Sequence, residues 1–300
     1  MVCEAQPGRH RDDLRSAFDG YGGVRTSAIG LTCEIASSHT LIFYAHITPL
    51  VLSFNEAPNL NRALDQLVWA SEVVVVDSFS TDETPSIARK CPNVRLIQRP
   101  FDTHVAQWNA GVDECRTDWI LALDADYVLS QGLVDELKRW EPDPNFDAYS
   151  CQFRYCIDGK PLRGSLYPPR AVLFRRSRCH YVQDGHTQLL YVPGKSGWLQ
   201  NVIFHDDRKS LSRWLVNQDL YARLEARKLM SSPHYKLRWR DRLRRQIVFA
   251  PALVFFTTLL GKGVILDGWR GWLYVCQRTV AELMLSLRLI EAKLEKDSPD

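Results

Sequence analysis

Two aspartates one residue apart, Asp124 and Asp126, follow five consecutive apolar residues, Trp119 to Leu123. So short an apolar run between polar flanks is typical of a buried strand. Residues two apart in an extended chain point to the same side, so the two carboxylates would repel each other unless a positive charge joins them. Mg²⁺ or Mn²⁺ suits hard carboxylate oxygens, and such ions usually also hold substrate phosphates. An acidic turn without metal is the alternative, because aspartate also favours turns.

The residues before this pair alternate between strand and helix patterns. Predicted strands cover residues 49–56, 72–77, 94–97 and 119–123. Predicted helices follow Pro58, span residues 85–90 with Ser80 or Thr81 as the cap, and run through Asn109 to end at Gly111. Strand and helix in strict alternation predict an α/β protein with a mostly parallel, doubly wound sheet.

Several polar side chains fall where the predicted strands end. Ser53, Glu56 and Asp77 lie at the ends of the first two strands, and the acidic pair lies at the end of the fourth. In such sheets ligands bind beyond the carboxyl ends of the strands, so this placement favours a binding site over an acidic turn. The sequence has neither a Gly-x-Gly-x-x-Gly nor a Walker A segment, which argues against a dinucleotide or P-loop site.

Four segments occur in order along the chain: Ser53-Phe-Asn-Glu56, Val75-Val-Asp-Ser-Phe-Ser-Thr-Asp82, Gln107-Trp-Asn-Ala-Gly111 and Leu123-Asp-Ala-Asp126. Together they resemble the family 2 inverting glycosyltransferases of the GT-A fold, a Rossmann-like sheet flanked by helices. The resemblance covers about residues 47–230. It is closest to the branch that adds β-linked sugars to lipopolysaccharide core or other envelope glycans.

The resemblance implies a role for each of these positions. Ser53, Glu56 and Asp77 would hold the nucleoside of a UDP-sugar, and Asn109 would lie near the nucleotide. Asp124 and Asp126 would form the Asp-x-Asp motif that binds Mg²⁺ or Mn²⁺, with His205 completing the metal shell. Each position also has a structural alternative: a helix cap for Asp77, a helix-end residue for Asn109, and an ordinary core histidine for His205.

The resemblance assigns residues 131–208 to the acceptor. Segments 146–157 and 173–182 have strand character, and Arg170, Arg175 and Arg176 add positive charge there, which is either a phosphate contact or solvated surface. An inverting transfer needs a base for the acceptor hydroxyl. Related sequences often place an acid directly after a histidine, where this chain has Thr187. Asp184 is therefore the first candidate base and His186 the second, with surface loop residues as the alternative.

The C-terminal third differs in composition from the rest. Residues 236–245 carry six basic residues and one acidic residue, and the apolar stretch 247–260 is too short to span a bilayer. Basic residues beside an apolar segment, followed by Trp269 and Trp272, indicate interfacial helices on an anionic membrane. Packing on the domain or on a second subunit, as in a homodimer, is the alternative. The net charge of +3 gives no reason to expect a nucleic-acid partner.

The predicted organisation has three parts. Residues 1–45 form a poorly structured arm, and 46–208 form the glycosyltransferase domain, with 46–130 for the nucleotide-sugar and 131–208 for the acceptor. Residues 209–300 form a helical extension. The first 25 residues lack the apolar core of a secretory signal, so we expect a cytoplasmic protein, peripheral on the cytosolic face of the inner membrane.

The sequence thus predicts a metal-dependent inverting glycosyltransferase. It would transfer glucose or a similar sugar from UDP to an envelope glycan or lipid-linked acceptor. Two alternatives remain at this stage. Asp124-x-Asp126 after an apolar strand also fits the nucleophile motif of haloacid-dehalogenase-like phosphatases. A catalytically inactive membrane-bound scaffold is the other, because of Thr187.

Overall fold

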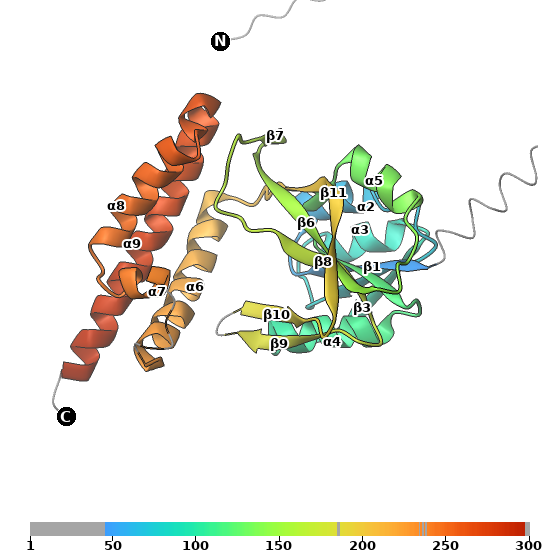
Figure 1. The fold of residues 1–300 in the computed structure, drawn as a ribbon, viewed down its shortest axis with the longest axis horizontal. Coiled ribbons are helices and arrows are strands. Elements are labelled where there is room, and N and C mark those ends of the chain that lie inside the picture. Colours follow the sequence, from blue (N-terminus) through green and yellow to red (C-terminus); the bar gives the residue numbers. More distant parts are fainter. Residues whose placement is uncertain (1–45, 185–186, 234, 236, 238, 298–300) are drawn as a thin grey trace, which may run out of the picture. The chain divides into compact units, whose positions relative to one another are not determined.

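The computed structural model describes residues 46–184, 187–233, 235, 237 and 239–297. The predicted N-terminal arm, residues 1–45, lies outside them. Within the described residues a nine-stranded sheet has the order β3-β2-β1-β4-β8-β6-β11-β5, with β7 attached to β6 (Figure 1). The predicted α/β fold class, with helices flanking a central sheet, is confirmed.

The first four strands form the parallel half of the sheet. They are β1 (Ile47–Ser53), β2 (Val73–Asp77), β3 (Val94–Gln98) and β4 (Trp119–Asp124). β1 lies between β2 and β4, parallel to both, and β3 is parallel to β2. Every residue of β2 is buried, because this strand is covered on both faces.

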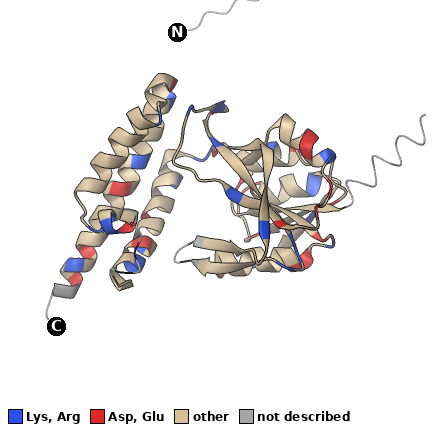
Figure 2. Cartoon of the chain, viewed as in Figure 1, with Lys and Arg blue, Asp and Glu red and all other residues tan. Residues whose placement is uncertain are grey.

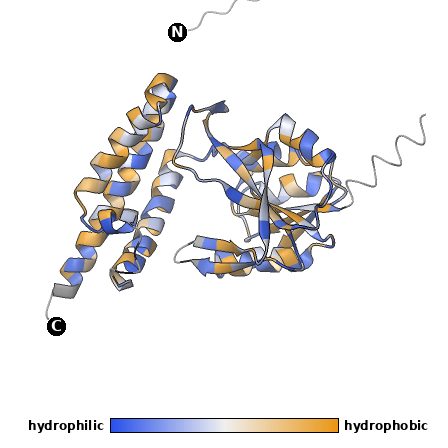
Figure 3. Ribbon diagram, in the orientation of Figure 1, coloured by the Kyte–Doolittle hydropathy of each residue, from blue (hydrophilic) through white to orange (hydrophobic). Residues whose placement is uncertain are grey.

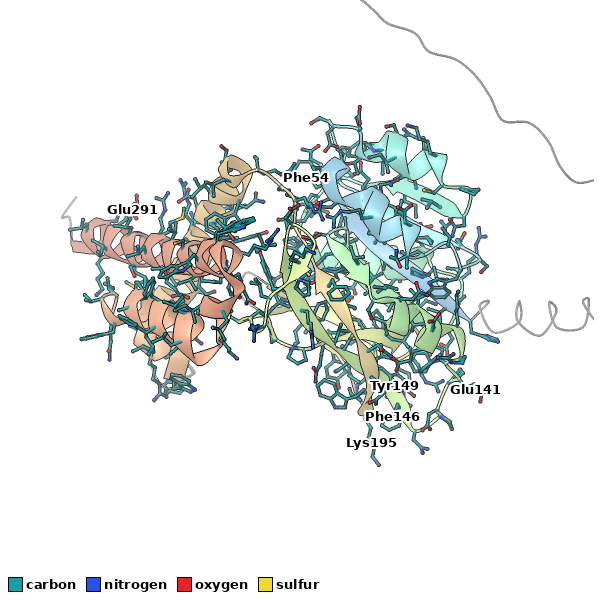
Figure 4. All side chains as sticks on the ribbon, turned by 90° about the horizontal axis from the view of Figure 1, so that it is seen from above. Phe54, Glu141, Phe146, Tyr149, Lys195 and Glu291 are labelled. Atoms are coloured by element: carbon teal, nitrogen blue, oxygen red, sulfur yellow. The ribbon has the colours of Figure 1, made fainter. Side chains whose placement is uncertain are left out.

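The second half of the sheet mixes directions. It contains β5 (Tyr127–Leu129), β6 (Phe146–Ile157), β7 (Lys160–Pro161), β8 (Arg170–Arg175) and β11 (Lys195–His205). β8 is antiparallel to both β4 and β6, while β6 and β11 are parallel. The carboxyl ends of β6 and β11 therefore lie at the same edge as those of β1 and β4. Figure 4 shows Phe54, just after β1, far from Phe146 and Lys195 at the amino ends of β6 and β11.

The single strand predicted over residues 173–182 is wrong. The chain turns after β8, where the N–H groups of Arg178 and Cys179 both donate to the carbonyl of Arg175. It then forms a separate hairpin of β9 (His180–Asp184) and β10 (Thr187–Tyr191). The sequence does not reveal this turn, because no glycine or proline marks it.

Helices cover both faces of the sheet. They are α2 (Ala57–Asp65), α3 (Thr84–Lys90), α4 (His104–Glu114) and α5 (Gln131–Lys138). One core cluster joins α2, α3 and α5 to Val73 and Val75, and the other joins α4 to Val74 and Val76. Successive valines of β2 thus point to opposite faces, as the period of two requires.

Two predicted helix boundaries are wrong. Neither Ser80 nor Thr81 caps α3, which begins at Thr84 after Glu83, with no capping side chain. α4 does not stop at Gly111 but continues to Glu114. Glycine at this position lets the helix approach the sheet closely. A Cβ on Gly111 would meet the Leu50 Cδ1 atom at 2.6 Å and the Val76 Cγ2 atom at 3.1 Å.

The C-terminal third is helical. It contains α6 (Leu211–Ser231), α7 (Trp239–Arg244), α8 (Phe249–Phe256), the π-helical turn η2 (Thr257–Gly261), the 3₁₀ turn η3 (Val264–Asp267) and α9 (Trp269–Asp297). α6 and α9 share a small apolar core and a salt bridge between Asp219 and Arg288. Figure 2 shows charged residues along α6 and α9, whereas α8 carries none. No helix among the described residues is long and apolar enough to cross a membrane.

The close contact at Gly111 gives a stability prediction. Gly111→Ala should lower the free energy of unfolding by about 1–2 kcal/mol, because overpacking against buried Leu50 outweighs the better helix propensity of alanine. Gly261→Ala is the matched control, since a Cβ there would meet no heavy atom within 4 Å, and it should stay within about 0.5 kcal/mol. Denaturant unfolding measures both. Equal stability of the two variants would contradict the close packing.

Candidate active site

The site is assembled by the pairing of two distant strands. β5 follows directly after Asp126 and pairs antiparallel with the end of β11, which places Tyr127 opposite His205. The Asp206 N–H donates to the Asp126 carbonyl at 3.0 Å. As a result the His205 Nε2 atom lies 3.3 Å from the Asp126 Oδ2 atom, although the residues are far apart in sequence. The structure thus brings together two of the three predicted metal ligands in direct contact.

The acidic pair is electrostatically uneven. Burial and the neighbouring Asp126 charge raise the pKa of Asp124. Burial also opposes ionisation of Asp126, but His205 and Lys209 outweigh it and lower the pKa of Asp126 to about 2. Burial lowers the pKa of His205, yet Asp126 raises it more, so the net direction is upward. Asp126 is therefore the more readily ionised carboxylate of the two, and Asp124 is the easier one to protonate.

The residues present fit a divalent cation. The Asp126 Oδ1 and His205 Nδ1 atoms are buried and have no hydrogen-bond partner within the part of the chain that the structure describes. Among the described residues, no three His, Cys, Asp or Glu side chains group closely enough to hold an ion alone. Mg²⁺ usually needs only one or two carboxylates, because water and substrate phosphates complete its shell. Ligation by His205 would require the loss of its proton, so metal binding would release protons.

Three tyrosines surround His205 and were missed at the sequence level. The ring centroids of Tyr167, Tyr155 and Tyr127 lie 4.6, 4.9 and 5.4 Å from that of His205. The Tyr127 and Tyr167 hydroxyls are hydrogen-bonded to each other. The Arg170 guanidinium lies 4.9 Å from the Tyr167 ring centroid. These aromatic walls exclude water from the imidazole and strengthen its attraction to Asp126.

Of the three arginines predicted near the acceptor, one lies by the acidic pair. Burial and Asp126 raise the pKa of Asp124, and the positive charge of Arg170 opposes part of this rise. Arg175 instead donates to the Phe146 carbonyl and lies over the Trp119 ring at 4.8 Å. Arg176 donates to the Cys115 carbonyl. Arg175 and Arg176 therefore stabilise the sheet at the amino ends of β4 and β6, opposite the site.

Asp77 organises the loop that follows β2. It is fully buried, and it accepts hydrogen bonds from the Ser53 hydroxyl at 3.0 Å and the Ser80 N–H at 2.9 Å. The Ser80 hydroxyl and the Gln98 amide also donate to it. The helix-cap alternative is wrong, because α3 begins seven residues later. The predicted contacts of Ser53 and Asp77 with the nucleoside remain predictions.

The loop after β1 is held in an unusual backbone conformation. Asn55 has φ 53° and Phe79 has φ 57°, both in the left-handed region that glycine usually occupies. The Asn55 side chain accepts from the Thr81 N–H at 2.7 Å, which fastens the two loops together. Phe54 and Phe79 remain exposed beside them. Such strained, exposed residues at the carboxyl edge are typical of a ligand-binding surface.

Asn109 links α4 to the β9 strand. Its amide donates to the Tyr181 carbonyl at 3.0 Å and accepts from the Tyr181 N–H at 2.9 Å. It lies inside the helix, so the helix-end alternative is wrong. Asp184 ends β9 opposite Thr187, and its backbone alone is described. His186 lies outside the described residues. The roles of Asn109, Asp184 and His186 therefore remain predictions.

A buried ion pair beside the acidic pair was also missed. The Lys209 ammonium lies 2.6 Å from the Glu56 Oε1 atom, and the Asn59 side-chain amide donates to the Glu56 Oε2 atom at 2.9 Å. Burial and the Asp126 charge raise the pKa of Glu56 to about 7, against the opposing effect of Lys209. Glu56 had a predicted substrate contact, but no sequence signal pairs it with a lysine 153 positions later.

Comparison with known proteins identifies the family. The model of Glycosyl transferase family 2 matches residues 50–199, half of the chain, so the chain belongs to this family. The chain is 20% identical over 269 residues to the lipopolysaccharide core biosynthesis glycosyltransferase LpsC of Rhizobium meliloti, covering 85% of this chain and 95% of that protein. The sheet and its acidic edge are the GT-A arrangement that the sequence predicts.

Other matches are partial or distant. An uncharacterized glycosyltransferase of Rickettsia bellii is 36% identical over 104 residues, which are 34% of this chain and only 35% of that relative. Among solved structures, S. aureus TarS 1-349 in complex with UDP-GlcNAc is 13% identical, with a TM-score of 0.46, over 84% of this chain and 92% of that chain.

The raised pKa of Glu56 predicts a pH effect on stability. A carboxyl with an ordinary pKa of 4.5, raised to about 7 by folding, favours the folded state below pH 4.5 and loses that contribution as the pH rises through 7. Relative to the native protein, Glu56→Gln should therefore gain about 3 kcal/mol of unfolding free energy between pH 4.5 and 8. Lys209→Met should change the profile in the opposite direction. Chemical unfolding across this range tests both, and parallel profiles for native protein and Glu56→Gln would contradict the assignment.

Proposed function

We propose that this protein is a metal-dependent inverting glycosyltransferase that uses a UDP-sugar. The single observation that carries the proposal is the contact of Asp126 with His205 at the carboxyl edge of a family 2 domain, where Asp126 Oδ1 has no hydrogen-bond partner among the described residues. Glucose or a similar hexose is the proposed sugar, and an envelope glycan or lipid-linked saccharide the acceptor. The similarity to a lipopolysaccharide core glycosyltransferase over most of both chains supports this acceptor class.

The first half of the reaction is the departure of the nucleoside diphosphate. Asp124, Asp126 and His205 would hold Mg²⁺ or Mn²⁺, and the bound ion would neutralise the charge of the departing nucleoside diphosphate. Arg170 and Lys209 add positive charge close to the two carboxylates. The loops ordered by Asn55 and Asp77 provide the edge on which the nucleoside would lie.

The second half of the reaction is the attack by the acceptor. Its hydroxyl oxygen attacks the anomeric carbon while the bond from that carbon to the diphosphate oxygen breaks, and the hydroxyl proton passes to a base. We propose Asp184 for this base and His186 as the second candidate. Asp184 is the last residue of β9, a strand that Asn109 fixes against α4.

The proposed setting is the cytosolic face of the inner membrane, with the helices after residue 208 bound to anionic lipid. Figure 3 shows α8 as an apolar helix on the C-terminal part of the chain. The absence of a spanning helix among the described residues agrees with a peripheral mode of binding. A homodimer through the same helices is the second candidate for this surface.

Family membership decides against the phosphatase alternative. In the fold, the acidic pair follows β4, a central strand beside β1, and is preceded by three strand–helix units. The inactive scaffold is the remaining alternative, and it predicts no turnover of any donor. Hydrolysis or transfer of a UDP-sugar above background excludes it.

Donor identity is testable by thermal unfolding with a panel of nucleotide sugars. UDP-glucose or a related UDP-hexose at 100 times its dissociation constant should stabilise the fold by about 2.7 kcal/mol in Mn²⁺ or Mg²⁺. ADP- and GDP-sugars at the same concentration serve as controls. Stabilisation by those nucleotides in place of uridine compounds would contradict the proposed donor.

Asp126 gives the sharpest activity prediction. Asp126→Asn should reduce transfer at least about a hundredfold, because charge stabilisation by the metal is worth several kcal/mol and each 1.36 kcal/mol is tenfold in rate. Asp65→Asn, at an exposed position on α2, is the matched control and should retain activity. Circular dichroism checks that both remain folded. Full activity in Asp126→Asn would remove this carboxylate from the mechanism.

A further inference from the structure

A short segment connects the C-terminal helices to the active site. This connecting segment, residues 162–167, runs between β7 and β8 and ends at Tyr167, which packs on His205. Its Arg163 N–H donates to the Asp267 carboxylate at 3.0 Å, and its Leu166 N–H donates to the Tyr274 hydroxyl at 2.8 Å. Asp267 is the last residue of η3, and Tyr274 lies in the second turn of α9.

The contact is closest at Gly164. A Cβ on Gly164 would lie 2.7 Å from the Lys262 carbonyl oxygen, so segment and helical turn touch through their backbones. Tyr274 is buried, and its ring centroid lies 4.8 Å from that of Tyr155, which itself packs on His205. A displacement of the α9 start must therefore displace the wall of the His205 site.

The same turn carries exposed apolar side chains. Leu266 is 67% exposed and Trp269 59% exposed. Further exposed members are Phe249, Leu253, Phe256, Leu260, Ile265, Trp272 and Leu273. We call this set the apolar turn surface. Its members run from α8 through η2 and η3 to the start of α9. An exposed apolar patch of this kind marks an interaction site.

Charge indicates which partner covers it. Residues 242–273 contain five basic residues and one acidic residue, Asp267, which is engaged by Arg163. One of the five, Arg244, forms a salt bridge with Glu282, so the charge argument rests on the other four. Arg270 stacks on Trp269 at 4.4 Å. Tryptophan with arginine and lysine around an apolar patch is typical of a membrane interface, and anionic lipid attracts such basic residues. A symmetric dimer through this surface would instead bring two basic sets together, and like charges across an interface are unfavourable.

We propose that the apolar turn surface docks on an anionic bilayer and that the connecting segment transmits this docking to the His205 site, so that the acceptor is a saccharide anchored in that same bilayer. This inference rests on the proposed function for the identity of the reaction. It assigns the acceptor class and the face of the enzyme that meets it. The lipid surface sets the position of Tyr167, and Tyr274 is the positioning residue between them.

Docking is tested with the full chain and phosphatidylethanolamine vesicles, with and without phosphatidylglycerol. The native protein should co-sediment roughly tenfold better when phosphatidylglycerol is present. The double variant Leu266→Glu/Trp269→Glu should lose most of this binding. Val68→Glu/Leu287→Glu, at two exposed apolar positions outside the surface, is the matched control and should bind as the native protein does.

Transmission is tested by hydrogen exchange of the connecting segment. Phosphatidylglycerol vesicles should slow exchange at Arg163 and Leu166 in the native protein. Tyr274→Phe keeps the ring but removes the hydroxyl that accepts from Leu166, so exchange there should rise roughly fivefold. This variant should still bind vesicles, and vesicles should no longer slow exchange at Leu166.

Three results would overturn the proposal. Equal vesicle binding by the native protein and Leu266→Glu/Trp269→Glu would exclude the apolar turn surface. A native dimer that this double variant converts to monomer, without vesicle binding, would assign the surface to a second copy. Unchanged exchange at Leu166 on vesicle binding would exclude transmission. UDP binding by calorimetry is measured separately on each variant, and its absence in all of them would contradict the proposed function while leaving the docking result intact.

Discussion

The contact between Asp126 and His205 is the interaction on which the site depends. Both side chains are largely buried, and a buried carboxylate needs a positive partner or loses its charge. The partner comes from β11 because β5, only three residues long, pairs with the end of that strand. The parallel half of the sheet supplies the acid and the mixed half supplies the histidine. Neither half contains a complete site alone.

Surrounding contacts hold β11 and its continuation in place. Asp206 forms a 2.6 Å salt bridge with Arg62 of α2, and Lys209 pairs with Glu56 after β1. Buried pairs of this kind add little net stability, but removal of one partner is costly, so they define a single arrangement. α6 begins directly after them, where the Ser210 hydroxyl accepts from the Arg213 N–H. Arg213 then donates to the Phe54 and Asn55 carbonyls, which ties the helical part of the chain to the loop after β1.

Much of the fold follows from local patterns, whereas the site only partly does. The valines of β2 and the apolar run before Asp124 predict central strands, because only a strand covered on both faces buries so many consecutive apolar residues. The turn after β8 has no glycine or proline to reveal it. The tyrosines around His205 and the Glu56–Lys209 pair come together only through long-range strand pairing, which no local period encodes. Asn109 shows the same limit, since its partner is a backbone 72 positions away.

The central claim is that Asp126 and His205 bind one divalent cation together. Electron paramagnetic resonance of Mn²⁺, titrated into protein with saturating UDP, measures this directly because bound and free Mn²⁺ give different signals. His205→Gln removes the imidazole while keeping a polar side chain of similar length. The account predicts that this variant binds Mn²⁺ roughly 10–100-fold more weakly than the native protein. Equal Mn²⁺ affinity in the two proteins would contradict the claim that His205 and Asp126 act on the same ion.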